Sequence, residues 1–191
     1  FHVTGVQTCA LPIFASALVL ASVAASAANF VQIEQENVQA RQNGDADSKA
    51  TYLRAGKDIG DYSLGFQSRT ARFSTASIAN SLEATVANKN VSVAGITPFV
   101  GMGHDFGGTG AGFNYGLVGA TTGVKVGPGF AMAGVKTRVG STQDGDRTKQ
   151  TLGFATYSIP VAKNVAVNLN VSRSWQTIKE NASGVGVSFS F

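Results

Sequence analysis

The chain has 191 residues, of which 43% are hydrophobic and only 14% charged, with 23 glycines and a formal net charge of +4. A length of this order favours one domain. The large hydrophobic fraction and a charge content well below the roughly 25% of soluble domains both argue against disorder. The mean hydropathy is only +0.09. Because no uncharged apolar run of about 18 residues lies outside the N-terminal region, the composition excludes a multi-helix membrane protein.

The first 14 residues differ from the rest of the chain. They contain the single cysteine, Cys9, and one of the two histidines, His2. The stretch 4–13 resembles the translation of a sequencing adapter. We therefore interpret residues 1–14 as a non-native segment and exclude them from fold reasoning.

Residues 15–28 consist only of Ala, Ser, Leu and Val and end in four small residues, Ala25 to Ala28. This composition is typical of the end of a secretory signal peptide, with a buried apolar helix as the alternative. Cleavage after Ala27 or Ala28 leaves a single domain at 29–191. That domain contains no cysteine, so we expect no disulfide bond in it.

Residues 29–191 are dominated by an alternation of apolar and polar side chains. The pattern is clearest at 165–172 and 184–191, and it predicts strands with two unlike faces. We predict ten strands, with eight as the alternative because the second, fourth and sixth are the weakest. The predicted strands are 30–41, 50–58, 61–73, 80–88, 90–104, 113–125, 129–141, 148–158, 163–175 and 182–191.

The connections between these strands alternate in length. Longer polar loops are predicted at 42–49, 74–79, 105–112, 141–149 and 176–181, and tight turns at 59–60, 89, 126–128 and 160–162. A meander that crosses an outer membrane shows this alternation, with long loops outside and short turns in the periplasm. The sequence therefore predicts an all-β fold, a transmembrane antiparallel up-and-down β-barrel.

Aromatic residues gather near the predicted strand ends, which suggests one girdle of rings at each membrane interface. The alternative is that aromatic residues simply favour strands. The proposed periplasmic girdle contains Phe30, Tyr62, Phe130, Tyr157 and Phe191, and the outer girdle contains Phe73, Phe106, Phe113 and Trp175.

Most charged residues fall in loops. Those within strands alternate with apolar neighbours, so the charged and apolar side chains point to opposite faces of the sheet. We therefore predict a lumen lined by three carboxylates and four cations: Glu34, Glu36, Arg54, Arg69, Glu83, Lys136 and Arg138. Arg173 instead shares the apolar face, near a strand end where a long side chain can snorkel. The lumen charges favour either a narrow pore for small anionic or neutral solutes, or ion pairs that plug a small barrel.

The C-terminal strand ends in an alternating pattern of Val185, Val187, Phe189 and Phe191. This pattern resembles the assembly signal of Gram-negative outer-membrane barrels. With the signal peptide and the alternation throughout 29–191, the chain resembles the bacterial outer-membrane β-barrel superfamily, in its small porin-like group. The resemblance implies insertion by the barrel-assembly machinery, location in the outer membrane, and contact with its lipid and lipopolysaccharide.

Other function classes have little support. His104 and Asp105 are adjacent, but neighbouring strand residues point in opposite directions, so we expect no enzyme activity. The acidic segments 43–47 and 144–146 lack the ligand spacing of a calcium loop, so we expect neither a metal nor a cofactor. No Lys/Arg block indicates nucleic-acid binding, and we expect a monomer. A soluble barrel with an apolar ligand inside would place the apolar face inward.

Overall fold

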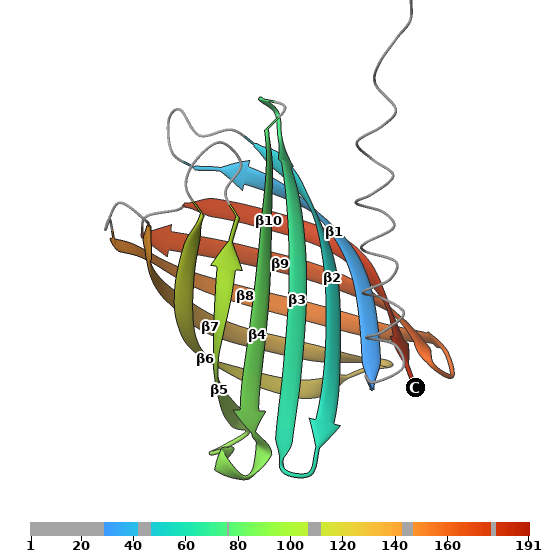
Figure 1. Ribbon diagram of the computed structural model, residues 1–191. Helices are drawn as coiled ribbons and strands as arrows, with labels where there is room; N and C mark the ends of the chain where they lie inside the picture. Colours follow the sequence, from blue (N-terminus) through green and yellow to red (C-terminus); the bar gives the residue numbers. More distant parts are fainter. Residues whose placement is uncertain (1–28, 42–46, 76, 107–111, 143–146, 177–178) are drawn as a thin grey trace, which may run out of the picture.

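The computed structural model describes residues 29–41, 47–75, 77–106, 112–142, 147–176 and 179–191. Ten antiparallel strands close into one barrel (Figure 1). They are β1 (Phe30–Ala40), β2 (Ser48–Ile59), β3 (Tyr62–Phe73), β4 (Ile78–Asn88), β5 (Ile96–Asp105), β6 (Phe113–Val126), β7 (Gly129–Thr142), β8 (Arg147–Ala162), β9 (Val165–Gln176) and β10 (Glu180–Ser190). The predicted fold class and strand number are confirmed, while the interpretations of 1–14 and 15–28 lie outside the described residues.

Each strand pairs with its neighbours in the sequence, and β1 pairs with β10 to close the barrel. Because the strand number is even, both ends of the barrel domain lie at the same rim, where the Phe191 amide donates to the Asn29 carbonyl at 3.0 Å. We call this rim, with its connections at 60–61, 89–95, 127–128 and 163–164, the turn end. The opposite rim, with connections at 41–47, 74–77, 106–112, 143–146 and 177–179, is the loop end.

Alternation along the strands becomes a difference between the two faces of the barrel. Apolar side chains on the outer face are exposed, with Val100 at 53%, Val118 at 60% and Val171 at 57%. Polar side chains on the inner face are buried, with Glu34 at 1% and Asn168 at 2%. This arrangement is the reverse of the soluble barrel with an apolar interior.

The connection between β4 and β5 is longer than predicted. A short 3-10 helix, η1 (Lys89–Val91), begins after Asn88, whose side-chain oxygen accepts a hydrogen bond from the Asn90 amide at 2.9 Å. A tight turn then places Ala94 and Gly95 at φ values of 51° and 77°. The predicted start of a strand at residue 90 is therefore wrong, because this local capping competes with extension of the strand. In the described part of the chain, no helix has the length and apolarity needed to cross a membrane.

The turn predicted at 160–162 is also wrong. Strand β8 continues to Ala162 and the chain reverses at 163–164. The register between β8 and β9 shifts between Pro160 and Ala162. A proline lacks an amide donor and is tolerated in a strand at such an irregularity, so Pro160 bends β8 without ending it.

Four of the nine predicted girdle rings lie on the inner face instead. Register places Phe30, Phe73, Phe113 and Phe130 among lumen-facing positions. Phe30 and Phe130 lie across Gly56 and Gly123 of the neighbouring strands, where an added Cβ atom would meet their rings. The two-girdle prediction therefore holds only in part, because nearness to a strand end does not decide which face a ring occupies. Tyr62, Tyr157 and Trp175 are at outer-face positions.

Candidate functional site: the charged lumen

The structure places all seven predicted lumen residues on the inner face of the barrel. The strand register assigns each residue to a face, because residues directly opposite one another on neighbouring strands point to the same side of the sheet. Two lie on β1, one each on β2, β3 and β4, and two on β7: Glu34, Glu36, Arg54, Arg69, Glu83, Lys136 and Arg138. The sequence alternation is sufficient to predict this placement.

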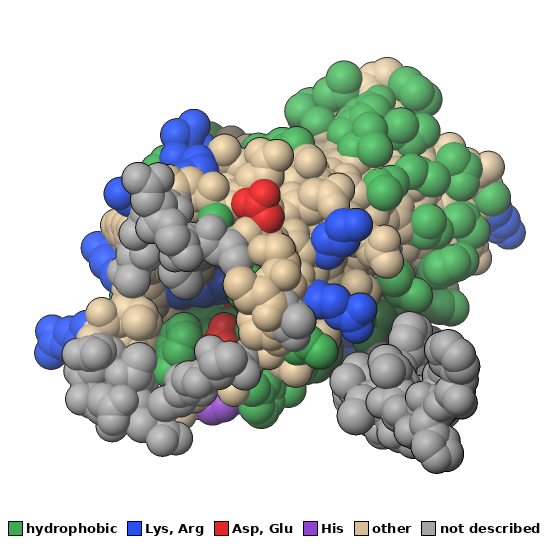
Figure 2. Space-filling view, turned by 90° about the horizontal axis from the view of Figure 1, so that it is seen from above, with side chains coloured by type: hydrophobic (Ala, Val, Ile, Leu, Met, Phe, Trp, Pro, Cys, Tyr) green, Lys and Arg blue, Asp and Glu red, His purple; other side chains and the backbone are tan. Residues whose placement is uncertain are grey.

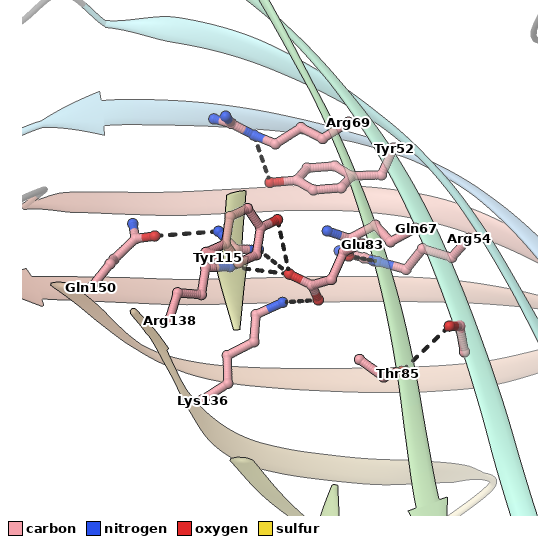
Figure 3. A network of polar contacts seen from close by, with 11 residues as sticks. Tyr52, Arg54, Gln67, Arg69, Glu83, Thr85, Tyr115, Lys136, Arg138 and Gln150 are labelled. Carbon is pink, nitrogen blue, oxygen red and sulfur yellow. Dashed lines mark hydrogen bonds and ion pairs between the residues drawn. The ribbon is translucent and has the colours of Figure 1, made fainter. Parts of the chain in front are cut away.

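Glu83 is the centre of one polar cluster in the lumen (Figure 3). Its Oε1 accepts a hydrogen bond from the Lys136 ammonium at 2.6 Å. Its Oε2 accepts two from the Arg138 guanidinium, at 2.6 Å and 3.0 Å. Arg138 also donates to the side-chain oxygen of Gln150 at 3.2 Å. Because β4 and β7 are not adjacent in the sheet, these ion pairs cross the interior of the barrel.

A glycine makes room for the tyrosine that completes this cluster. Gly103 pairs with both Glu83 and Tyr115, and an added Cβ atom there would lie 2.3 Å from the Tyr115 ring. The ring therefore occupies the space above Gly103, and its hydroxyl reaches to 3.5 Å from Glu83 Oε2. The Arg138 guanidinium lies 5.2 Å from the centre of the same ring, within cation–π range.

A second cluster joins β1, β2 and β3. Glu34 is ion-paired with Arg54 and accepts a hydrogen bond from the Gln32 amide at 2.6 Å. Arg54 also donates to the Gln67 side chain at 2.9 Å, and its guanidinium lies 4.6 Å from the centre of the Tyr52 ring. Arg54 is therefore held on several sides and lies fixed against one wall of the lumen.

Arg69 is held differently from the other three lumen cations. Its Nε donates to the Tyr52 hydroxyl at 3.1 Å. Within the described ranges, no carboxylate lies within ion-pair distance of its guanidinium, whereas Arg54, Lys136 and Arg138 each have one. Among the described residues, Arg69 therefore forms no direct ion pair, and the carboxylates Glu36 and Glu180 act on its charge from a greater distance.

A cavity of about 850 Å³ extends through this interior. Its lining includes Phe73 and Phe113 near the loop end and Ala87 and Phe99 near the turn end. The ion-paired clusters therefore occupy part of the cross-section and leave open space beside them. Figure 2 looks down on the loop end, where charged side chains of both signs are visible.

The cavity lining contains carboxylates that the sequence did not assign to it. Asp105 and Glu180 line the cavity at the loop end. Sequence reasoning placed both in loops, but β5 extends to Asp105 and β10 begins at Glu180. Besides the predicted three carboxylates and four cations, the lining therefore contains two further carboxylates and one further cation, Lys149.

The sequence analysis also missed two lumen tyrosines, Tyr52 and Tyr115, because it considered only charged side chains. The Tyr52 hydroxyl accepts a hydrogen bond from Arg69, and the Tyr115 hydroxyl lies 3.5 Å from a Glu83 carboxylate oxygen. Tyr52 shares the parity of Arg54, which would have indicated an inward ring. Tyr115 offered no such signal, since its inward neighbour two positions on is the apolar Leu117.

The other candidate residues do not form a site with these clusters. His104 is at an outer-face position, with Nδ1 2.8 Å from the Asn114 side-chain oxygen and its ring against Phe106. Asp105 points into the lumen, so the pair is divided between two faces, as the sequence predicts. Of the acidic segments, 43–46 and 144–146 lie outside the described residues.

The four residues of the proposed assembly signal lie at the end of the last strand. Val185, Val187 and Phe189 are exposed on the outer face of β10, and Phe191 follows it. Their part in assembly stays a prediction.

Comparison with known proteins supports the architecture. No protein-family model matches the sequence, and no curated protein matches it. The translocator domain of the autotransporter NalP from Neisseria meningitidis is similar in structure, with 12% identity and a TM-score of 0.50 over 98% of this chain and 100% of that one. This chain has the fold of an outer-membrane β-barrel.

Two further solved structures also align over most of their length. Neisserial surface protein A shares 13% identity at a TM-score of 0.46, covering 85% of this chain and 96% of that one. The KdgM porin shares 12% identity at a TM-score of 0.46, covering 84% and 99%. At these identities the likeness concerns the fold alone.

Proposed function

We propose that this chain is a monomeric barrel of the bacterial outer membrane that lets small anionic or neutral solutes diffuse passively through its lumen. The observation that carries the proposal is the cavity of about 850 Å³, which is lined by residues from both ends of the barrel and passes the charged clusters. A barrel whose side chains filled the interior would leave no such space.

The membrane location is supported by the chemistry of the outer face. Exposed valines and leucines cover the strands on several sides, including Val135, Leu169 and Val185. In water such a surface would cost free energy in proportion to its apolar area, whereas lipid chains solvate it. We place the turn end in the periplasm and the loop end outside, as in barrels of this type.

The solute class is inferred from the balance of lumen contacts. Glu83 is bound by two cations and Glu34 by one. Arg69 has no carboxylate within ion-pair distance in the described structure, and Glu36 and Glu180 act on its charge only from farther away, so we infer that it can still attract a passing anion. Fixed cations in a narrow pore favour anions, while Asp105 and Glu180 at the loop end limit that preference.

The second candidate is a plugged barrel without conductance, whose external loops carry its role. The specific observation that favours it is the Glu83 cluster, which joins β4 to β7 across the interior. A rigid cross-link at this position reduces the free cross-section.

Conductance of the purified protein in a planar lipid bilayer separates the two. We expect stepwise channels whose reversal potential in a salt gradient indicates an anion preference. Arg69→Gln should reduce that preference, while Lys57→Gln, an exposed outer-face position near the turn end, should leave it unchanged. A bilayer that stays silent at all voltages after verified insertion would remove the pore and favour the plugged barrel.

A further inference from the structure

The charged residues of the strands are sorted by sign between the two faces of the barrel. By register, the strand carboxylates occupy inner-face positions, beside the cations described above. By register, the outer-face charges are all cations: Lys49, Lys57, Arg72, Arg147, Lys149 and Arg173, of which Lys149 also borders the cavity. Chance placement of carboxylates and cations would mix both signs on each face.

Five of these six cations lie in the half of the barrel next to the loop end, and only Lys57 lies near the turn end. A cation in the middle of the lipid layer costs roughly 2–4 kcal/mol, but one level with the headgroups costs little. The outer-face cations are therefore concentrated where the barrel meets one leaflet of the membrane.

Lys49 of β2 and Arg72 of β3 form the densest part of this surface. They are directly opposite one another in the register, and both are exposed. Like charges in such a cross-strand pair repel one another. In the ranges that the structure describes, neither side chain has a carboxylate within ion-pair distance, so nothing within that part of the chain offsets their repulsion. An anion bound between them would do so.

The neighbours of this pair match the other parts of a lipid. Asn37 of β1 is opposite Lys49 and is exposed, offering amide donors beside the two cations. Toward the turn end, the same outer face becomes apolar at Leu53, Phe66 and Ile33. An anionic headgroup at the pair thus has its hydrocarbon chains against an apolar wall.

We propose that Lys49 and Arg72, with Asn37, bind the phosphate of a phosphorylated glycolipid in the outer leaflet, with the acyl chains lying along β1–β3. The inference rests on the proposed membrane location but not on conductance. A second copy of this chain fits less well, because it would bring the same cations against one another. A carboxylate has fewer oxygens for the combined amide, ammonium and guanidinium donors than a phosphate has.

Native mass spectrometry of the detergent-purified protein tests this proposal, with diphosphoryl lipid A as the probe. The wild type should bind lipid A, and Lys49→Gln combined with Arg72→Gln should weaken binding about 30-fold, which corresponds to the loss of two basic contacts at an anionic lipid surface. Lys57→Gln on the same face is the matched control and should bind as the wild type does. Dephosphorylated lipid A should bind weakly to every variant.

The proposal would be overturned by equal lipid A binding of the double variant, by equal binding of the dephosphorylated lipid, or by a dimer that the double substitution abolishes. Inorganic phosphate that competes fully with lipid A would identify a site for a soluble anion, which also contradicts it. Insertion into vesicles is measured on the same preparations. Protein that inserts yet binds no lipid A contradicts this inference alone, whereas protein that fails to insert contradicts the membrane location itself.

Discussion

Glu83 is the residue on which the lumen network depends most. It is 6% exposed and is shared by Lys136 and Arg138, which approach it from β7, three strands away around the barrel. Removing one partner of a buried ion pair leaves the other charges without compensation in a poorly hydrated site, and this costs more than the pair itself contributes. Glu83 is therefore both a structural cross-link and a determinant of the field inside the lumen.

Glu83→Gln should lower the free energy of unfolding by about 3 kcal/mol, because Lys136 and Arg138 then lose their common counter-charge. The measurement is urea-induced unfolding in detergent micelles, followed by tryptophan fluorescence. Glu36→Gln is the control, since this carboxylate faces the same lumen but has no cation within ion-pair distance among the described residues. Equal losses for both variants would contradict a special role of the Glu83 ion pairs.

Gly103 is required by the ring beside it. An added Cβ atom would lie 2.3 Å from Tyr115 and 2.6 Å from the Leu82 carbonyl oxygen. Gly103→Ala should therefore destabilise the barrel by about 1–3 kcal/mol through overpacking. Gly116→Ala is the matched control, because nothing lies within 4 Å of an added Cβ atom there. The same unfolding measurement distinguishes them, and a neutral Gly103→Ala would show that Tyr115 can move away.

At the scale of elements, the hairpins of the turn end are determined by short-range chemistry. Strands β2 and β3 are joined by Gly60 and Asp61, and Ile59 pairs directly with Tyr62. Gly60 has φ +57°. A glycine with positive φ at the first position of a two-residue turn is typical of the type II′ hairpin, whose twist matches that of the strands.

Gly60→Ala should cost about 1–2 kcal/mol of stability, because its positive φ is unfavourable for a residue with a Cβ atom. Nothing lies within 4 Å of an added Cβ atom, so the cost is conformational and does not come from a clash. Gly60→Asn should cost less, since asparagine tolerates this region. Thermal unfolding, followed by the heat-dependent shift in gel mobility, compares the two, and identical midpoints would contradict the strained-turn explanation.

At the scale of the whole molecule, the barrel is organised as two concentric surfaces. The inner surface holds the carboxylates of the strands and their partners, and the outer surface is apolar with cations toward the loop end. A soluble protein with this surface would aggregate. The distribution suits a barrel in lipid whose polar groups are satisfied internally.

A test of this organisation uses two positions on the outer face of β6. Val118→Arg places a cation in the middle of the apolar belt and should cost roughly 2–4 kcal/mol in phospholipid vesicles, whereas Asn114→Arg, nearer the loop end, should cost no more than about 1 kcal/mol. Reversible unfolding in vesicles measures both. Equal costs would show that this face does not lie in lipid.

Much of the fold could be predicted because alternation is a local property of the sequence. Each inward-facing charged residue, such as Arg54 or Lys136, lies beside apolar residues that face outward, so the alternation predicts that the charge faces the lumen. The predictions that were wrong involve competition between local interactions, as where Asn88 caps η1 and β5 starts late, or where β8 continues past Pro160. The girdle prediction was wrong in part because distance from a strand end says nothing about which face a ring occupies.

The sequence by itself determined the fold class and the faces on which the charges lie, since a period of two requires no knowledge of distant residues. It left ten or eight strands open, and the tertiary structure decided for ten. Only the tertiary structure decided which charges meet. The pairing of Glu83 with Lys136 and Arg138 joins strands that are not neighbours, and it depends on closure of the barrel and on space above Gly103. Closure likewise left the cavity open, because curvature arises from the whole sheet. The alignment of Lys49 with Arg72, by contrast, follows from the two-residue turn that joins β2 to β3.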